Sequence, residues 1–350
     1  MQQDIKNRPL FSLVIPCHNP EKTIFRLFNS LTRQSVPKRE LEIVVVDDNS
    51  DNLEYRERLK SYEYNVVFAE TDVELHCPGN TREEGLKHVS GEWVFFCDQD
   101  DYFEDNSLLN VKSYIQSNMG KKMYVISTIM RSYSPDYNEC YFSHVHKAAW
   151  LHGKWYNMDN LIKPYNIHFK KDLYSHEDVY FNDVVLSVLF KLEVDWDYLD
   201  IPTYRWCDNP ESITRRKTND RGYLYENFND YIVAASEPYW EGAKDVNNMI
   251  FRNQVIMTLL HTYFYYECAS YLYGSKDYAD VLEHIHVLLM RMMNELSMTP
   301  EFIVDYVYAD AYKYDKVYND CSIDLGFIPK TSFRDFIFRL SGIEHVVKKQ

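Results

Sequence analysis

The chain has 350 residues, of which 45% are hydrophobic and 26% are charged, a composition that indicates a folded protein and excludes a wholly disordered one. Its formal net charge of -15 argues against binding along a nucleic-acid backbone, because that affinity depends on clustered Lys and Arg, so no nucleic-acid partner is expected. The cysteine count of seven is odd and the cysteines stand singly, which predicts reduced thiols rather than disulfides or a zinc site.

The N-terminal segment is polar. Its first six residues, Met1-Gln2-Gln3-Asp4-Ile5-Lys6, lack the apolar segment of a secretory signal. No apolar run in the sequence approaches the ~20 residues that a membrane-spanning helix needs. We therefore expect a soluble cytoplasmic protein.

The first part of the sequence alternates strand and helix patterns. A strand is predicted over 11–15, and Asn19 and Pro20 then predict the start of a helix whose apolar residues recur at helical spacing as far as Leu31. Later strands are expected at 43–46, at 65–69, from Trp93 and at 123–129, and later helices from Asn80 toward Ser90 and over 107–117. This alternation predicts right-handed crossovers and a largely parallel sheet through about residue 130.

The second part of the sequence changes in character. After a mixed region, with a helix expected near 179–190 and short strands near 194–197 and 203–206, long helical patterns rich in Tyr and Met follow from about residue 215. Helices are expected over 246–273, over 278–296 and from Thr299-Pro300-Glu301. We therefore divide the chain into a sheet domain, residues 1–214, and a helical module, residues 215–350.

Two predicted strands end in acidic residues. Asp98-Gln99-Asp100-Asp101 follows the apolar run from Trp93, and Asp47-Asp48 follows the strand at 43–46. Carboxylates this close repel one another, so they need a nearby cation, and the carboxyl ends of parallel strands face the ligand crevice of open α/β sheets. An oxygen-only ligand set there suits Mg²⁺ or Mn²⁺ bridging substrate phosphates. The alternative for the Asp-rich segment taken alone is a solvated turn.

Five stretches together resemble the inverting glycosyltransferases of family 2, which have the GT-A fold. They are Val14-Ile15-Pro16-Cys17-His18-Asn19, Val45-Val46-Asp47-Asp48-Asn49-Ser50, Asn80-Thr81-Arg82-Glu83-Glu84-Gly85, Gly91 through Asp101, and His176-Glu177-Asp178. The resemblance covers roughly residues 10–214, and the helical module lies outside it. It implies an α/β fold with a mostly parallel, nucleotide-binding sheet flanked by helices.

The resemblance also implies how a nucleotide would bind. Pro16 and His18 match the loop that walls the base, and Asp48 matches the position that hydrogen-bonds the base, usually uracil. Arg82 matches the arginine that reaches the nucleotide side of the donor, and a cation on the first turn of a helix opposes the macrodipole, which indicates an anion nearby. The sequence departs from the commoner pattern at His18 and at Glu83, where Asn is usual.

The Asp-X-Asp motif is matched by Asp98, Gln99 and Asp100. The resemblance implies that Asp98 lies near the ribose and the metal, that Asp100 binds the metal, Mn²⁺ or Mg²⁺, and that Gln99 belongs to the nucleotide-sugar site. Downstream, Arg205 lies in a segment that matches one closing over the diphosphate, together with Ser212-Ile213-Thr214, which makes this arginine a candidate phosphate contact.

The acidic pair Glu177-Asp178 precedes the helix predicted from Val179, and the family places its catalytic base there. Inversion by direct displacement needs one carboxylate to take the proton of the acceptor hydroxyl. We predict Asp178 as the base, with Glu177 as the alternative. Both could instead be helix N-terminal acids that complement the macrodipole, a contribution of only ~0.3–1 kcal/mol.

Aromatic residues near the presumed acceptor cleft are candidates for holding a saccharide, because the C–H faces of sugars stack on rings; they are Trp150, Trp155, Tyr156 and Trp206. The alternative for each is an ordinary core position. The tail, with Phe336, Ile337, Phe338 and Leu340 among basic residues, is interpreted as a packed amphipathic helix, the other possibility being one that lies on a membrane surface.

These patterns together predict a metal-dependent, inverting transferase that moves a sugar from a UDP-sugar donor to a hydroxyl of a saccharide, glycolipid or glycoprotein acceptor. The helical module would shape the acceptor site or form a homo-oligomer, and peripheral contact with the inner face of the membrane is possible. Two alternatives are a sugar-phosphate nucleotidyltransferase, for which no glycine-rich phosphate loop follows the first strand, and a non-catalytic saccharide-binding protein of the same fold. The sequence leaves the transferred sugar and the acceptor open.

Overall fold

The computed structural model describes residues 8–71, 77–118, 124–134, 137–142, 150–171, 173–207, 228–273, 279–310 and 330–342. Contacts within the chain divide it into two compact units, Met1–Arg216 and Lys217–Gln350. The boundary predicted at residues 214/215 lies outside the described residues, as does the polar segment at the N-terminus.

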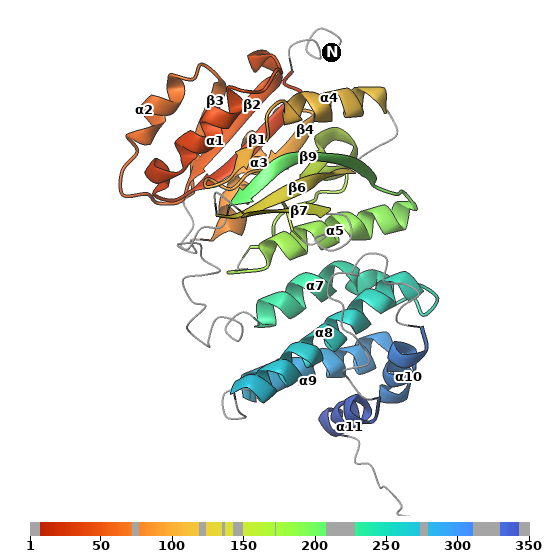
Figure 1. Cartoon of the computed structure of the whole chain (residues 1–350). Coiled ribbons are helices and arrows are strands. Elements are labelled where there is room, and N and C mark those ends of the chain that lie inside the picture. The colour runs from red at the N-terminus through yellow and green to blue at the C-terminus, as the bar shows by residue number, and fades with distance from the viewer. Residues whose placement is uncertain are drawn as a thin grey trace, which may run out of the picture. The chain divides into compact units, whose positions relative to one another are not determined.

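The first unit is built on one nine-stranded sheet (Figure 1). Its strands follow the order β3-β2-β1-β4-β8-β6-β9-β5, and β7 pairs with β6. The bounds are β1 (Phe11–Cys17), β2 (Leu41–Asp47), β3 (Asn65–Glu70), β4 (Trp93–Phe96), β5 (Tyr102–Phe103), β6 (Tyr124–Ser134), β7 (Tyr137–Phe142), β8 (Lys154–Asn157) and β9 (Asp197–Cys207).

The sheet is parallel in its first half and mixed in its second. Strands β3, β2, β1 and β4 run parallel to one another, which confirms the prediction for this part of the sequence. Strand β8 lies antiparallel between β4 and β6, and β5 and β7 are also antiparallel to their neighbours. The prediction of a largely parallel sheet as far as residue 130 holds for the direction of β6, which runs the same way as β4. The pattern does not foresee that β8, an antiparallel strand from later in the chain, lies between them.

Helices cover both faces of this sheet. Side chains alternate between the two faces of a strand, so Leu13 and Phe95 pack in the core with α1, α2 and α4, whereas Val14 and Phe96 face α3 and α5. The helices of the unit are η2 (Pro20–Lys22), α1 (Ile24–Leu31), η3 (Lys38–Glu40), α2 (Tyr55–Lys60), α3 (Pro78–His88), α4 (Ser107–Ser117), η4 (Met158–Ile162) and α5 (Glu177–Leu192).

Two helix starts differ from the predictions. Asn19 adopts a left-handed conformation with φ 46° and makes no side-chain cap, so a 3₁₀ turn comes first and α1 begins only at Ile24. Helix α5 begins at Glu177 rather than at Val179, with His176 at its N-cap. The acidic pair therefore lies inside the first turn of α5.

Trp155 and Tyr156 are core residues, with 0% of either exposed. The Trp155 ring lies 4.5 Å from that of Phe95, and the Tyr156 ring stacks on Tyr124 at 5.2 Å while its hydroxyl donates to Asn182 Oδ1 at 2.7 Å. Because β8 is covered on both faces, these rings have no surface to offer an acceptor. The prediction that they hold a saccharide is wrong in this structure.

The second unit is helical. Its helices are α7 (Phe228–Ala243), α8 (Met249–Tyr273), α9 (Ala279–Leu296), α10 (Pro300–Asp310) and α11 (Lys330–Leu340). Helix α8 packs against both α7 and α9, and it is buried on every side from Phe251 to Tyr263. Helix α7 was not predicted; it contains Pro238, a residue that usually ends or kinks a helix.

Helix α11 packs inside the second unit. Phe333, Phe336, Ile337 and Phe338 are buried, and the ring of Phe336 lies 4.4 Å from that of Tyr263. This supports the packed amphipathic helix over one that lies on a membrane. Searched over its described residues, the chain has no helix with the length and apolar character to cross a membrane.

Candidate functional site

The carboxyl ends of β1, β2 and β4 lie at one edge of the sheet, because the three strands are parallel neighbours. The loop after β1 joins the other two ends. His18 N–H donates to Gln99 Oε1 at 2.9 Å, and Gln99 Nε2 donates back to the His18 carbonyl at 3.1 Å. The ring Nδ1 of His18 lies 2.8 Å from the carbonyl oxygen of Asp48. The base loop, Asp48 and the acidic turn after β4 therefore meet, as the sequence predicts.

The two acids that end β2 differ in their contacts. Asp47 is buried and accepts hydrogen bonds from the Tyr55 hydroxyl and the Ser50 N–H, both at 2.8 Å, so it fixes the turn. Asp48 is half-buried at the edge, and its carboxylate accepts from Thr71 Oγ1 at 2.9 Å. Asp48 is thus the acid placed at the ligand-facing edge, where a nucleotide base is expected.

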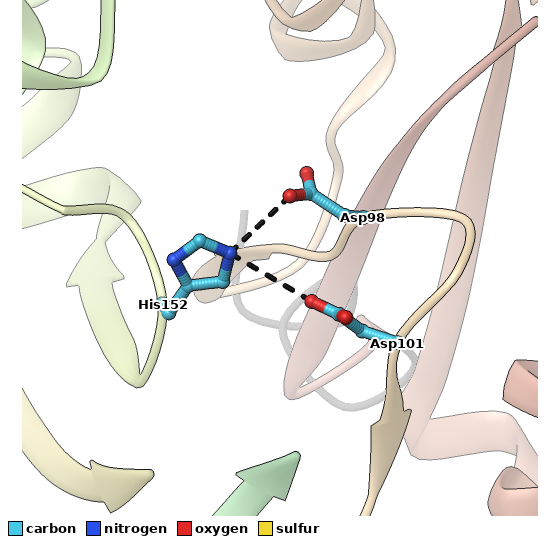
Figure 2. A group of neighbouring side chains, drawn as sticks. All are labelled: Asp98, Asp101 and His152. Carbon is cyan, nitrogen blue, oxygen red and sulfur yellow. Dashed lines mark hydrogen bonds and ion pairs between the residues drawn. The ribbon is translucent and has the colours of Figure 1, made fainter. Parts of the chain in front are cut away.

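Three side chains form a cluster with the spacing of a cation site: Asp98 and Asp101 from the turn after β4, and His152 from the segment before β8 (Figure 2). One ligand atom from each lies within 4.8 Å of the others. His152 Nε2 is 3.2 Å from Asp98 Oδ2 and 3.7 Å from Asp101 Oδ2. Both carboxylates point toward the same ring nitrogen.

The electrostatics of this cluster fit a divalent cation. Burial, with Asp98 and Asp100 adding to it, raises the pKa of the Asp101 carboxyl well above its usual range. Burial also acts on Asp98, but Arg82 and His152 outweigh it and hold its pKa below the ordinary value. Asp101 is 0% exposed; its Oδ1 accepts from the Cys207 N–H at 2.8 Å, while Oδ2 has no hydrogen-bond partner among the described residues. A cation would offset this repulsion and satisfy that oxygen.

The metal ligands predicted from the sequence were Asp98 and Asp100. The cluster contains Asp98 but pairs it with Asp101 and His152, and the contribution of the Asp100 carboxylate stays a prediction. Sequence reasoning missed His152 because it stands in no motif. Its place beside the acidic turn depends on β8 lying next to β4, a pairing that joins residues more than 50 positions apart. Carboxylate ligands suit both Mg²⁺ and Mn²⁺.

Arg82 connects the acidic turn to the acidic pair. From the first half of α3, its Nη2 donates to Asp98 Oδ1 and its Nη1 donates to Glu177 Oε1, both at 2.7 Å. Only 6% of Arg82 is exposed. Burial would lower the pKa of this guanidinium, but Asp98 and Glu177 outweigh burial and raise it, so the side chain stays charged. One buried cation thereby holds three elements, α3, α5 and the turn after β4.

Asp178 lies in the first turn of α5, where its Oδ1 accepts from the Val179 N–H at 2.8 Å. Loss of solvation and the neighbouring Glu177 raise the pKa of Asp178 to about 7, against the opposing effect of Arg82. A carboxyl with a pKa near the working pH is suited to proton transfer, because it is both ionised and basic enough to accept a proton. The geometry therefore brings the predicted base, the arginine and the acidic turn into one site.

Other predicted residues have defined surroundings. Arg205 pairs with Glu104, with Nη2 2.6 Å from Oε1, so its contact with a phosphate stays a prediction. Trp206 is half-buried, its ring 4.9 Å from that of Trp150 and 5.4 Å from that of His152. Pro16 is half-buried in β1, between the buried residues Ile15 and Cys17, and Ser212-Ile213-Thr214 lies outside the described residues.

The unusual residue Glu83 has a structural explanation. Its Oε2 accepts from the Phe169 N–H at 2.8 Å and so ties α3 to the segment before α5. A carboxylate at this position therefore supports the backbone that leads to the acidic pair.

Comparison with known proteins agrees with this geometry. Residues 12–172 match the family model described as Glycosyl transferase family 2. The poly(ribitol-phosphate) beta-N-acetylglucosaminyltransferase TarS of Staphylococcus aureus strain Mu50 is 37% identical over 107 residues, which cover 30% of this chain and 18% of TarS. The uncharacterized glycosyltransferase EpsJ of Bacillus subtilis strain 168 is 24% identical over 290 residues, covering 75% of this chain and 79% of EpsJ.

A solved structure shows the same fold. The crystal structure of S. aureus TarS 1-349 in complex with UDP-GlcNAc superposes with a TM-score of 0.63 at 21% identity, covering 88% of this chain and 90% of that one. The predicted GT-A-like α/β fold with C-terminal helices is thus confirmed. The match to full-length TarS covers less than a fifth of that protein.

Proposed function

Because residues 12–172 match the glycosyltransferase family 2 model, we propose that the chain is an inverting, metal-dependent glycosyltransferase that moves a sugar from a UDP-sugar to a hydroxyl of a saccharide or glycoconjugate acceptor. The observation that carries the proposal is the convergence at one sheet edge of Asp48, the Asp98–Asp101–His152 cluster and Asp178. A turn that merely exposed its acids to water would leave these side chains apart.

The donor end of the site supports a uridine nucleotide. Asp48 lies where the family resemblance expects the base, and the His18 loop closes beside it through its contacts with Gln99. The similarity to TarS, whose structure holds UDP-GlcNAc, supports a UDP-sugar over other nucleotide sugars. The name of TarS also makes a polyol-phosphate polymer of the cell surface the first acceptor to test.

Asp98, Asp101 and His152 would hold a divalent cation, Mn²⁺ or Mg²⁺. Such an ion supplies charge neutralisation for the donor diphosphate and for the nucleoside diphosphate that leaves. These residues fit the ion because Asp101 Oδ2 is buried and unsatisfied, and because two carboxylates and one imidazole are ordinary ligands of Mn²⁺.

The acids at the start of α5 supply the base. The carboxylate of Asp178, with that of Glu177 as the alternative, takes the proton as the acceptor O–H bond breaks. The acceptor oxygen forms a bond to the anomeric carbon of the sugar, and the bond from that carbon to the diphosphate oxygen breaks with its electron pair. The products are the inverted glycoside and UDP, so the reaction needs no further reactant.

The acceptor side is proposed to include Trp150 and Trp206. Their rings lie together beside His152, half-buried, where a sugar or polyol chain could pack its C–H groups. The helical second unit is proposed to shape the acceptor site or to form an oligomer.

The experiment that tests the proposal measures UDP release. A panel of nucleotide sugars is first screened by thermal shift with Mn²⁺, because donor binding stabilises the folded state. Donors that bind are then incubated with poly(ribitol-phosphate) and with saccharide acceptors, and UDP and the anomeric configuration of the product are determined. Pyrophosphate release would indicate a nucleotidyltransferase, and UDP formation that persists in EDTA would contradict metal dependence.

A further inference from the structure

The two acids that begin α5 have different surroundings. Glu177 is 9% exposed, and its Oε1 accepts from Arg82 Nη1 at 2.7 Å. Gly79, in the first turn of α3, lies against its stem: a Cβ at position 79 would be 2.8 Å from the Cβ of Glu177, closer than such atoms approach. Asp178 is half-buried and accepts from the backbone of its own helix. Glu177 is therefore held by α3 on two sides.

The partner of Glu177 is itself tied to the cation cluster. Arg82 donates with its other nitrogen, Nη2, to Asp98 Oδ1. A buried guanidinium that loses one of its two acids is only partly compensated, so both carboxylates contribute to holding Arg82 in place. Asp98 in turn presents its second oxygen, Oδ2, to His152. A continuous chain of contacts thus runs from the start of α5 to the cluster.

We propose that Glu177 is a positioning residue that clamps Arg82 against Asp98 and fixes the first turn of α5, which leaves Asp178 as the acid that receives the acceptor proton. This inference rests on the proposed function, because it presupposes transfer to a hydroxyl. It gives Glu177 a role of its own, where the sequence offered this residue only as the alternative to Asp178 as the base.

The same arrangement has an electrostatic consequence. Charged and titratable groups face Asp178 from every element around it: Glu177 on α5, Arg82 on α3, His152 before β8, and Lys154 and Tyr156 on β8. Among them, Glu177 is the group that disfavours ionisation of Asp178, after the loss of solvation. Removing its charge would favour the ionised base, so the base would work at lower pH.

The test replaces Glu177 by Gln, which keeps an oxygen to accept from Arg82 and removes the charge. We expect kcat of Glu177→Gln to stay within about tenfold of wild type, and the acidic limb of its pH–rate profile to move down by about one pH unit. Asp178→Asn should lose at least ~100-fold in kcat. Glu193→Gln is the matched control, because it removes an exposed acid at the other end of the same helix and should leave rate and profile unchanged.

A second readout does not need turnover. The titration of the Asp178 carboxyl carbon, followed by ¹³C NMR, should shift to lower pH in Glu177→Gln and stay unchanged in Glu193→Gln. If Glu177→Gln does not fold, Gly79→Ala tests the same contact from the other side, because its new methyl group must displace Glu177. We expect Gly79→Ala to lower kcat more than it raises the donor KM.

Two results would overturn the assignment. Loss of ~100-fold or more in Glu177→Gln, with Asp178→Asn still active, would make Glu177 the base. An unmoved acidic limb and an unmoved carboxyl titration would show that Glu177 has no influence on Asp178. Failure of the proposed function looks different: wild-type protein would then release no UDP with any donor and acceptor, while the NMR titration would still report on the pair.

Discussion

Replacing Asp101 by Asn separates two effects of this buried acid: the cost of its charge in the metal-free fold, and its contribution to metal binding. Asn keeps an oxygen that accepts from the Cys207 N–H and has nearly the same volume, so packing is preserved while the charge is lost. The raised pKa of Asp101 means that the folded, metal-free protein binds a proton more readily than the unfolded chain does. Its stability therefore falls as the pH rises from the ordinary Asp range toward that raised pKa, by about 1.4 kcal/mol for each unit of elevation.

Metal binding has the opposite effect on stability, because it stabilises the folded protein. At a free Mn²⁺ concentration 100 times the Kd, the wild-type protein should gain about 2.7 kcal/mol, a rise in Tm of roughly 5–11 °C for a unit of this size. If loss of the Asp101 charge weakens Mn²⁺ binding by about 100-fold, Asp101→Asn gains only about 0.4 kcal/mol at the same concentration, or about 1–2 °C.

The assay is a pair of thermal melts at neutral pH for each protein, one in EDTA and one in Mn²⁺. We expect Asp101→Asn to melt at or above the wild-type temperature in EDTA and below it in Mn²⁺. A variant less stable than wild type in EDTA would show that Asp101 stabilises the fold without a cation. Equal gains in Mn²⁺ for both proteins would show that the ion binds elsewhere.

Three further outcomes are expected. Transfer should rise with pH through about 7, because Asp178 must lose its proton to act as base, and a rate independent of pH between 5 and 9 would refute that role. Trp206→Ala should raise the acceptor KM by about tenfold and leave the donor KM unchanged, whereas an equal effect on both would contradict an acceptor contact. Trp155→Ala should lower the free energy of unfolding by about 3–5 kcal/mol in denaturant titration, because its ring fills the core; a variant as stable as wild type would be inconsistent with that packing.

The sequence predicts the parallel half of the sheet well, because each strand there is an apolar run that ends in polar residues. The same pattern correctly places Asp48 and the acidic turn at one edge, since parallel neighbours end together. It does not predict β8, whose Lys154-Trp155-Tyr156-Asn157 run mixes polar and aromatic residues, and so it cannot bring His152 to the cluster.

Side-chain environment is the other part that the sequence pattern does not determine. Trp155 and Trp206 are the same residue type in neighbouring regions of the fold, yet one is sealed in the core and the other reaches the cluster. The pairing of the strands determines which of the two tryptophans is buried. Likewise, Glu177 and Asp178 are adjacent acids, and their difference arises from Arg82 and Gly79, about 100 positions earlier.

Helix α3 reverses the usual ranking of helix-forming residues. Alanine is ordinarily better than glycine inside a helix by about 1 kcal/mol, yet neither Gly79 nor Gly85 in α3 has room for a methyl group. At Gly85 a Cβ would lie 2.4 Å from Val14 Cγ1 of β1, and at Gly79 it would collide with Glu177. Helix α3 therefore sets the distance between the sheet and the start of α5. Attempts to raise thermostability by filling its glycines would push the arginine that it carries out of alignment.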